Sequence, residues 1–130
     1  MDYNELIKLI NISMDNLDLV SARRYMEQNM DVLDQNRHLL RSNARALFNF
    51  LKKEQMAGVD PLSRKDITII YSINKHATKF DIRGLKLSIN NHAELLARED
   101  IKYYLNDDAK ILLESMNVIN KKEKELTFAT

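Results

Sequence analysis

The sequence contains no cysteine and no tryptophan, and its 130 residues include only two glycines and one proline. Average usage of about 7% Gly and 5% Pro would give roughly 15 such residues in a chain of this length. Hairpin turns and positive-φ positions usually depend on these two residue types. Their scarcity argues against a fold rich in β-strands and predicts an all-α protein.

The missing cysteines exclude a disulfide, a thiolate zinc site and a thiol nucleophile. The chain begins with the acidic stretch Met-Asp-Tyr-Asn-Glu, whereas a secretory leader begins basic and continues apolar. No window approaches the run of about 18 apolar residues that a membrane-spanning helix needs. We therefore expect a cytoplasmic protein with no membrane segment.

Known catalytic and cofactor-binding motifs are also missing. The sequence has no glycine-rich phosphate loop, no G-x-S-x-G and no H-E-x-x-H pattern. The three histidines, His38, His76 and His92, are too far apart in sequence to share one helix face. We expect no enzymatic activity, no cofactor and no bound metal.

Periodic apolar residues predict about six helices. The first three span residues 3–14, 19–36 with a break near Asn29, and 42–55. The last three open after Ser63, Asp81 and Asp107, and their apolar stripes continue to Ala77, Leu96 and Met116. Gly84 lies one turn inside the fifth of these, where only packing or flexibility explains it. Side chains suited to helix N-caps or capping boxes open five of the segments: Asp2 with Glu5, Asp18, Ser63 with Asp66, Asp81 and Asp107.

The stretch 57–61 is the clearest break in the helical pattern, because it combines Gly58 and Pro61. It divides a predicted single domain, residues 1–120, into possible halves 1–56 and 62–119. Residues 121–130 are expected to form a mobile tail. The halves are expected to stack as an α-solenoid-like array or an irregular bundle.

The two halves align at a shift of 63 residues. This shift places Asp18 on Asp81, and a two-residue insertion near Arg37 then places Ala44 on Ala109. Only five of the 32 positions in 6–37 are identical at this shift. The alignment therefore leaves open whether the halves are a tandem three-helix repeat or two hairpins with a similar apolar pattern.

The first hairpin resembles a tetratricopeptide unit over roughly residues 3–36, and residues 66–99 resemble it more faintly. Leu6, Leu9, Ala22 and Met26 stand where that family has large, large, small and large residues. Ile10, Ser13 and Asn29 depart from its pattern, as does Leu85 in the second half. The resemblance implies an α-solenoid-like surface that docks a peptide or a partner helix.

Charge is unevenly distributed along the chain. Residues 1–36 carry seven acidic and three basic side chains, whereas residues 37–53 carry five basic and none acidic. Arg41, Arg45 and Lys52 recur at helical spacing, with Asn49 between the last two, and form one basic stripe. The stripe is either a solvated face that pairs with the acidic first hairpin, a surface for acidic proteins, or a nucleic-acid contact.

Two polar residues interrupt predicted apolar stripes. Asn29 lies between Met26 and Leu33, and His92 lies between Ile89 and Leu96. Each either satisfies carbonyl groups at a helix end or flanks a groove and binds a ligand backbone.

Two further pairs lie outside these stripes. Ile111 and Val118 form either the edge of the core or the seam of a homodimer. Tyr103 and Tyr104 are expected to pack the connection between the last two helices.

Together these features predict a non-catalytic protein-interaction or regulatory module. It would bind a partner protein or peptide through a helical groove and the basic helix face, using Arg41, Arg45, Asn49, Lys52, Asn29 and His92. The alternative is a nucleic-acid-associated regulator that uses the same basic stripe.

Overall fold

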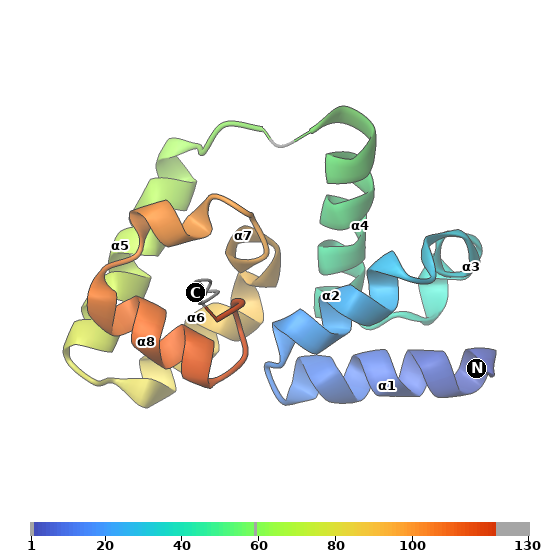
Figure 1. Cartoon of the computed structure of the whole chain (residues 1–130), viewed down its shortest axis with the longest axis horizontal. Coiled ribbons are helices and arrows are strands. Elements are labelled where there is room, and N and C mark those ends of the chain that lie inside the picture. Colours follow the sequence, from blue (N-terminus) through green and yellow to red (C-terminus); the bar gives the residue numbers. More distant parts are fainter. Residues whose placement is uncertain (1, 59, 122–130) are drawn as a thin grey trace, which may run out of the picture.

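The computed structural model describes residues 2–58 and 60–121, and these residues form helices and connections without any strand (Figure 1). The N-terminal half contains α1 (Tyr3–Asp15), α2 (Leu19–Glu27), α3 (Met30–Gln35), a 3-10 turn η1 (Arg37–Leu39) and α4 (Ser42–Ala57). The C-terminal half contains α5 (Arg64–Thr78), α6 (Ile82–Asn91), α7 (Ala93–Leu96), η2 (Ile101–Tyr104) and α8 (Asp107–Ser115). The predicted all-α class is confirmed.

The described residues form eight α-helices, so the expected count of about six is too low. The break predicted near Asn29 separates α2 from α3. A second break, which periodicity did not predict, falls at His92 and separates α6 from α7. His92 has φ −135° and ψ 41°, outside the helical region, although apolar residues continue on the same stripe beyond it. Periodicity alone therefore cannot locate such a break.

Three of the five predicted N-caps are confirmed. Ser63 and Asp66 form a reciprocal capping box, and the side chains of Asp18 and Asp81 accept from the first turns of α2 and α6. The Asp2–Glu5 box is wrong, since the Asp2 side chain makes no capping bond. Asp107 is also wrong as a cap.

The residue that caps α8 is Asn106. Its backbone is extended, and its side chain accepts from Ala109 N at 2.8 Å. Because Asn106 takes the N-cap position, Asp107 becomes the first helical residue.

The two halves have the same order of elements, and their backbone torsions agree at the shifts used for the alignment. Asn29 (φ −138°, ψ 35°) and His92 (φ −135°, ψ 41°) lie 63 residues apart. Leu40 (φ −79°, ψ 142°) and Leu105 (φ −90°, ψ 141°) lie 65 apart. The residues that follow the first helix of each half, Asn16 and Lys79, and the N-caps of its last helix, Arg41 and Asn106, also match.

Three helices end at a residue in the left-handed region that is not glycine. Leu17, Phe80 and Asn117 have φ of 59°, 54° and 62° and follow α1, α5 and α8. After each of them the next N–H bonds back to a carbonyl five residues earlier, as Asp81 N does to His76 O at 2.8 Å. This is the Schellman arrangement, in which glycine is usual. These three helix ends therefore form without the glycine that such ends normally use, whereas α4 ends at Gly58 with φ 82°.

Gly84 has a packing reason. A Cβ at this position would lie 2.5 Å from Asp81 Oδ2 and 2.6 Å from His76 Nδ1. The side chains of His76 and Asp81 therefore occupy the space beside the first turn of α6.

A continuous hydrophobic core links the two halves. The predicted stripe residues Ala44, Leu47, Phe48 and Leu51 of α4 are buried, and α4 packs against α7. Val118 is 2% exposed and belongs to the core, whereas Ile111 is 64% exposed, so a dimer seam that pairs these two residues is wrong.

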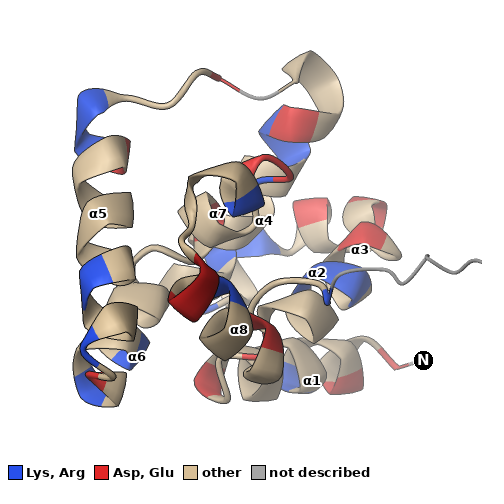
Figure 2. Ribbon diagram, turned by 60° about the vertical axis from the view of Figure 1, so that its left-hand side comes forward, with Lys and Arg blue, Asp and Glu red and all other residues tan. Residues whose placement is uncertain are grey.

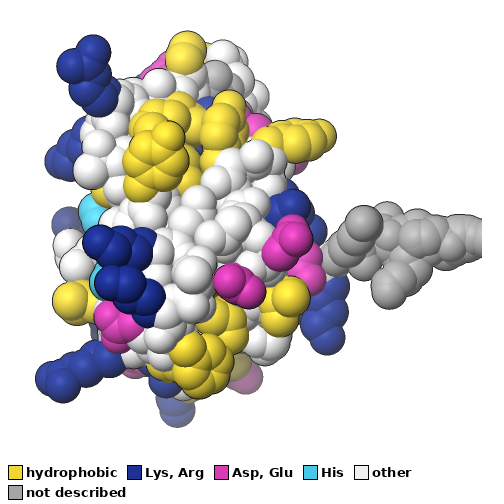
Figure 3. Space-filling model, turned by 90° about the vertical axis from the view of Figure 1, so that its left-hand side faces the viewer, with side chains coloured by type: hydrophobic (Ala, Val, Ile, Leu, Met, Phe, Trp, Pro, Cys, Tyr) yellow, Lys and Arg dark blue, Asp and Glu magenta, His cyan; other side chains and the backbone are white. Residues whose placement is uncertain are grey.

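The tyrosines of η2 do not pack the connection as predicted. Tyr103 is 87% exposed and Tyr104 44%, and the buried residues of the connection are Ile101 and Leu105. Figure 3 shows the outer face of the C-terminal half, where hydrophobic side chains gather in two groups with Lys and Arg around them. The predicted mobile tail lies outside the described residues apart from Lys121.

Candidate functional site

The predicted basic stripe lies on α4, and its side chains contact residues of the N-terminal half. Arg41 Nη1 lies 2.7 Å and 2.8 Å from the two carboxylate oxygens of Asp15, and Lys52 Nζ lies 2.6 Å from Asp34 Oδ2. Arg37 also pairs with Asp34. The pKa of Asp34 is lowered by its hydrogen bonds from Lys52 and Arg37. The acidic first hairpin thus neutralises much of this stripe.

The other two residues of the stripe also have partners. Arg45 Nη2 donates to Leu40 O at 2.9 Å, and Asn49 Oδ1 accepts from Arg37 Nη1 at 2.9 Å. The guanidinium of Arg37 also lies 5.5 Å from the ring centroid of Phe48. Arg45 and Asn49 remain exposed.

Asn29 and His92 occupy helix junctions. Asn29 Nδ2 donates to Tyr25 O at 2.8 Å, which satisfies a carbonyl near the end of α2. His92 stands between α6 and α7, and its side chain lines a pocket under the chain that joins the halves. The structure therefore does not bring together the six predicted site residues.

Several pockets are lined by residues of both halves, and two of them share Arg98. The first, of about 550 Å³, has an apolar floor that includes Leu19, Leu96 and Ile101. Charged residues of α2 and of the segment after α7 form its rim: Arg23, Arg24, Glu27, Arg98, Glu99 and Lys102. The second, of about 510 Å³, lies between α4, α5 and α7, and Phe50, Ile69 and Leu95 supply its apolar wall. We call these two pockets the inter-half cleft.

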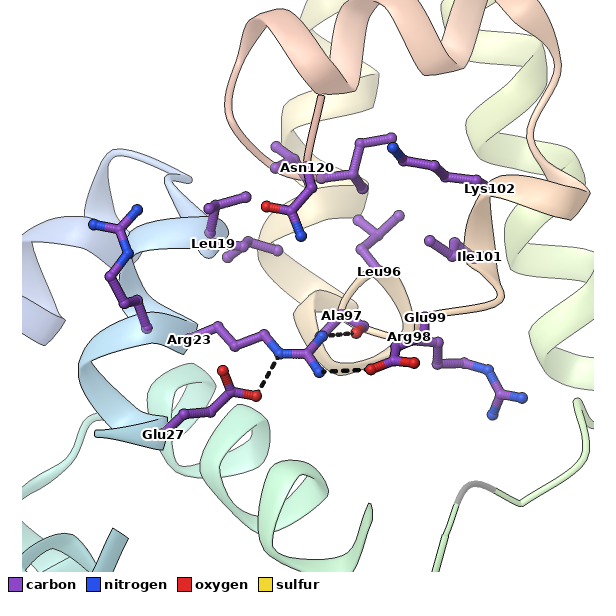
Figure 4. Close-up of a pocket in the computed structure, with 14 residues that line it drawn as sticks. Leu19, Arg23, Glu27, Leu96, Ala97, Arg98, Glu99, Ile101, Lys102 and Asn120 are labelled. Atoms are coloured by element: carbon purple, nitrogen blue, oxygen red, sulfur yellow. Dashed lines mark hydrogen bonds and ion pairs between the residues drawn. The ribbon is translucent and has the colours of Figure 1, made fainter. Parts of the chain in front are cut away.

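Arg23 is the central side chain of the cleft. It extends from α2 toward the C-terminal half, where Nη1 donates to the carbonyl of Ala97 (Figure 4). Its Nε lies 2.9 Å from Glu27 Oε2, and its Nη2 lies 3.3 Å from Glu54 Oε1 and 3.9 Å from Glu99 Oε2. One cation therefore joins α2, α4 and the segment after α7.

Glu54 lies on the α4 side of this cluster. Burial raises the pKa of its carboxyl, Arg23 opposes this shift, and the nearby carboxylates Glu99 and Glu27 add to it. A raised pKa in a pocket is a common property of functional sites, although ion-pair networks produce it too.

Arg98 lines both pockets and is 8% exposed. Its Nε and Nη2 donate to the two oxygens of Asp100 at 2.9 Å and 3.0 Å. This pairing lowers the pKa of Asp100 and fixes the guanidinium in one plane.

Ser72, His76 and Asp81 are arranged in the order of a hydrolase triad. Ser72 Oγ lies 3.4 Å from His76 Nε2, and His76 Nδ1 lies 3.0 Å from Asp81 Oδ2. Ser72 is in the middle of α5, where backbone N–H groups are used by the helix, and Asp81 already accepts from Gly84 N. An oxyanion needs N–H donors free to receive it. His76 and Asp81 thus join the end of α5 to the first turn of α6.

Residues 2–58 and 60–121 contain neither a metal-binding cluster nor a membrane-spanning helix. No group of three or more His, Asp or Glu side chains there is placed to hold a metal ion. The helices in these ranges are all too short or too polar to cross a membrane.

Comparison with known proteins gives no match: no family model, no curated protein and no solved structure is similar to this chain.

The sequence predicted a groove between the halves and one residue of its lining, His92, but not the charged residues at its centre. Arg23, Glu54 and Arg98 lie in three different helices or connections and have no common spacing. The sequence gives one weak indication of them: Arg23 and Arg98 each stand next to the apolar residues of a predicted helix.

Proposed function

We propose that the protein is a non-catalytic, cytoplasmic interaction module that binds a segment of a partner protein in the inter-half cleft. The observation that supports this most is the first pocket, which combines an apolar floor with the exposed cation Arg24 on its rim. The other cations of its lining, Arg23, Arg98 and Lys102, are paired with carboxylates. An apolar anchor flanked by acidic side chains fits such a pocket best.

The α4 stripe has less support as a binding face. Arg41 and Lys52 are held by Asp15 and Asp34, so a ligand would have to displace carboxylates that lie within 2.8 Å of these cations. The same pairing weakens the nucleic-acid alternative, because phosphates would compete with these carboxylates. Arg24, by contrast, is exposed on the rim of the first pocket.

The tetratricopeptide-like reading is part of the same proposal. Paired helices and a cleft lined by both halves suit an α-solenoid-like surface that docks a peptide. Under this reading the two halves are the units of a short tandem array.

Selection of a random peptide library on the immobilised protein tests the proposal. Selected peptides are then titrated calorimetrically into the native protein, Arg24→Glu and Arg45→Glu, two variants with equal charge change on exposed arginines. We expect acidic peptides with an apolar residue, whose binding weakens at least tenfold with Arg24→Glu and stays unchanged with Arg45→Glu.

Two results would contradict the cleft proposal. One is peptide binding that is lost with Arg45→Glu but kept with Arg24→Glu, which would indicate that peptides bind at α4. The other is the absence of peptides sensitive to Arg24→Glu, combined with binding of random duplex DNA at about 50 mM salt that falls steeply as salt rises, which would favour the nucleic-acid alternative.

A further inference from the structure

The chain that follows α8 forms part of the first pocket (Figure 4). Asn117 turns the chain in the left-handed region at φ 62°, and its carbonyl accepts from Val20 N at 3.2 Å. Val118, Ile119 and Asn120 then line the pocket beside α2. Val118 and Ile119 are buried, at 2% and 4% exposure, whereas Asn120 is exposed. The described chain therefore runs along the wall of the pocket immediately before it ends.

The sequence that comes next lies outside the described residues. Residues 122–130 read Lys-Glu-Lys-Glu-Leu-Thr-Phe-Ala-Thr, and we call them the C-terminal segment. Its two large apolar residues, Leu126 and Phe128, come directly after the carboxylates of Glu123 and Glu125. An apolar anchor beside acidic side chains is the ligand chemistry that the first pocket fits best.

The pocket carries charges that complement both signs in this segment. Arg24 is exposed on its rim, and the side chain of Glu99 is 82% exposed although it lies 3.9 Å from Arg23 Nη2. Figure 2 shows basic and acidic residues close together around α2 and α7. The glutamates of the C-terminal segment can therefore pair with Arg24, and its lysines can pair with Glu99.

The point of attachment also favours binding within the same chain. Leu126 lies six residues beyond Asn120, and Phe128 lies eight. An extended chain spans up to about 3.3–3.6 Å per residue, so both side chains can reach across a pocket of about 550 Å³. A ligand tethered by a short linker has an effective concentration in the millimolar range, so even weak contacts suffice to fill the pocket.

We propose that the C-terminal segment binds in the first pocket of its own chain and competes there with the partner segment. The proposal rests on the proposed function, because both ligands use the same pocket. Leu126 and Phe128 supply the apolar anchors, and Glu125 pairs with Arg24. A partner segment must then displace the C-terminal segment before it binds, so the intramolecular contact regulates the affinity of the pocket.

Paramagnetic relaxation enhancement in the full chain tests this contact directly. The native sequence contains no cysteine, so Ala129→Cys provides a single site for a nitroxide label. We expect the label to broaden the backbone amide signals of Leu96 and Ala97, which line the pocket. The double substitution Leu126→Ser/Phe128→Ser in the labelled chain should remove most of this broadening, because it removes both anchors.

Two further variants of the labelled chain separate the anchors from their surroundings. Thr127→Ser changes the same segment without removing an anchor, so it should keep the broadening. Arg24→Glu should reduce the broadening, because it places like charges at the contact with Glu125.

Peptide binding provides the second measurement. In calorimetric titrations, peptides selected on the native protein should bind the full chain with Leu126→Ser/Phe128→Ser about fivefold or more tightly than they bind the native chain. The substitutions empty the pocket of its internal ligand, and the apparent affinity rises with the fraction of protein that is competent to bind.

Three results would overturn the proposal. The first is broadening that is the same with and without Leu126→Ser/Phe128→Ser, because the label would then report only where the segment is attached. The second is a peptide affinity that this double substitution leaves unchanged. The third is broadening found only between a labelled chain and a separate isotope-labelled chain, which would place the segment in the pocket of a second copy.

The relaxation experiment needs no partner peptide, so it separates this proposal from the proposed function. If no peptide is selected but the broadening depends on Leu126 and Phe128, the intramolecular contact stands and the proposed partner binding fails. If peptides bind as expected but the broadening does not depend on these two residues, the proposed function stands and the intramolecular contact fails.

Discussion

His76 Nδ1 lies 3.0 Å from Asp81 Oδ2, and this pair occupies the space where a side chain at Gly84 would begin. Asp81 caps α6 through its other oxygen, which accepts from Gly84 N at 3.0 Å. The backbone bond from Gly84 is the main cause that lowers the pKa of Asp81, and the bond with His76 adds to it. The end of α5, the turn and the start of α6 are therefore fixed together around one glycine.

Gly84→Ala should destabilise the protein, although alanine is the better helix former. The added Cβ would meet Asp81 Oδ2 and His76 Nδ1, so the cap or the pair must move. We expect the melting temperature to fall by several degrees in thermal unfolding. The same substitution in a His76→Ala background should cost less, and an equal cost in both backgrounds would show that the ring is not the obstacle.

Phe80→Gly should stabilise the protein by about 1 kcal/mol, because it relieves a left-handed conformation that L-residues adopt at a cost. Phe80 is 69% exposed, so little packing is lost with its ring. Leu17→Gly is the matched change at the equivalent turn, but Leu17 packs against the core, so its gain should be smaller or absent. Urea unfolding measures the free energy of unfolding of both variants. A lower value for Phe80→Gly than for the native protein would contradict the proposal that Phe80 adopts its left-handed conformation at a cost.

Arg23→Met should destabilise the fold by about 1–2 kcal/mol, since it leaves Glu27, Glu54 and Glu99 without their shared cation. Arg24→Met, on the same helix but exposed, should change stability by less than about 0.5 kcal/mol. The free energy of unfolding in urea distinguishes the two. If Arg23→Met changed the free energy of unfolding as little as Arg24→Met, the charge of Arg23 would not stabilise the fold. Its contribution would then come from its alkyl chain, which methionine largely replaces.

The pH dependence of stability should reveal Glu54. Its pKa is raised in the folded state, so the folded protein holds this proton more tightly than the unfolded chain. As pH rises from below the ordinary value of 4.5 through the raised pKa, this group lowers the free energy of unfolding. Glu54→Gln removes that contribution, so the variant should lose less stability than the native protein across this window. If the free energy of unfolding of the two proteins changed with pH in parallel, folding would not raise the pKa of Glu54.

The predicted basic stripe illustrates how far local sequence reaches into a site. Spacing predicted that Arg41, Arg45 and Lys52 share one helix face; in the structure Arg45 and Lys52 lie on α4, and Arg41 is its N-cap residue. Spacing could not choose among the three uses considered for that face, since the carboxylates of Asp15 and Asp34 come from other helices. The cleft residues Arg23, Glu54 and Arg98 were beyond prediction for the same reason, because their meeting depends on how helices pack.

The sequence by itself determined the helical class, the positions of most helices and several of their caps, because these depend on contacts within about four residues of the chain. It also located the link near Gly58 and Pro61 and the shifts of 63 and 65 at which backbone torsions recur. Tertiary structure decided the rest. It put the break at His92, buried Val118 while leaving Ile111 exposed, and paired Arg23 with carboxylates up to 76 residues away. Those outcomes depend on which faces the helices bury against one another, and periodicity along a single helix cannot encode that choice.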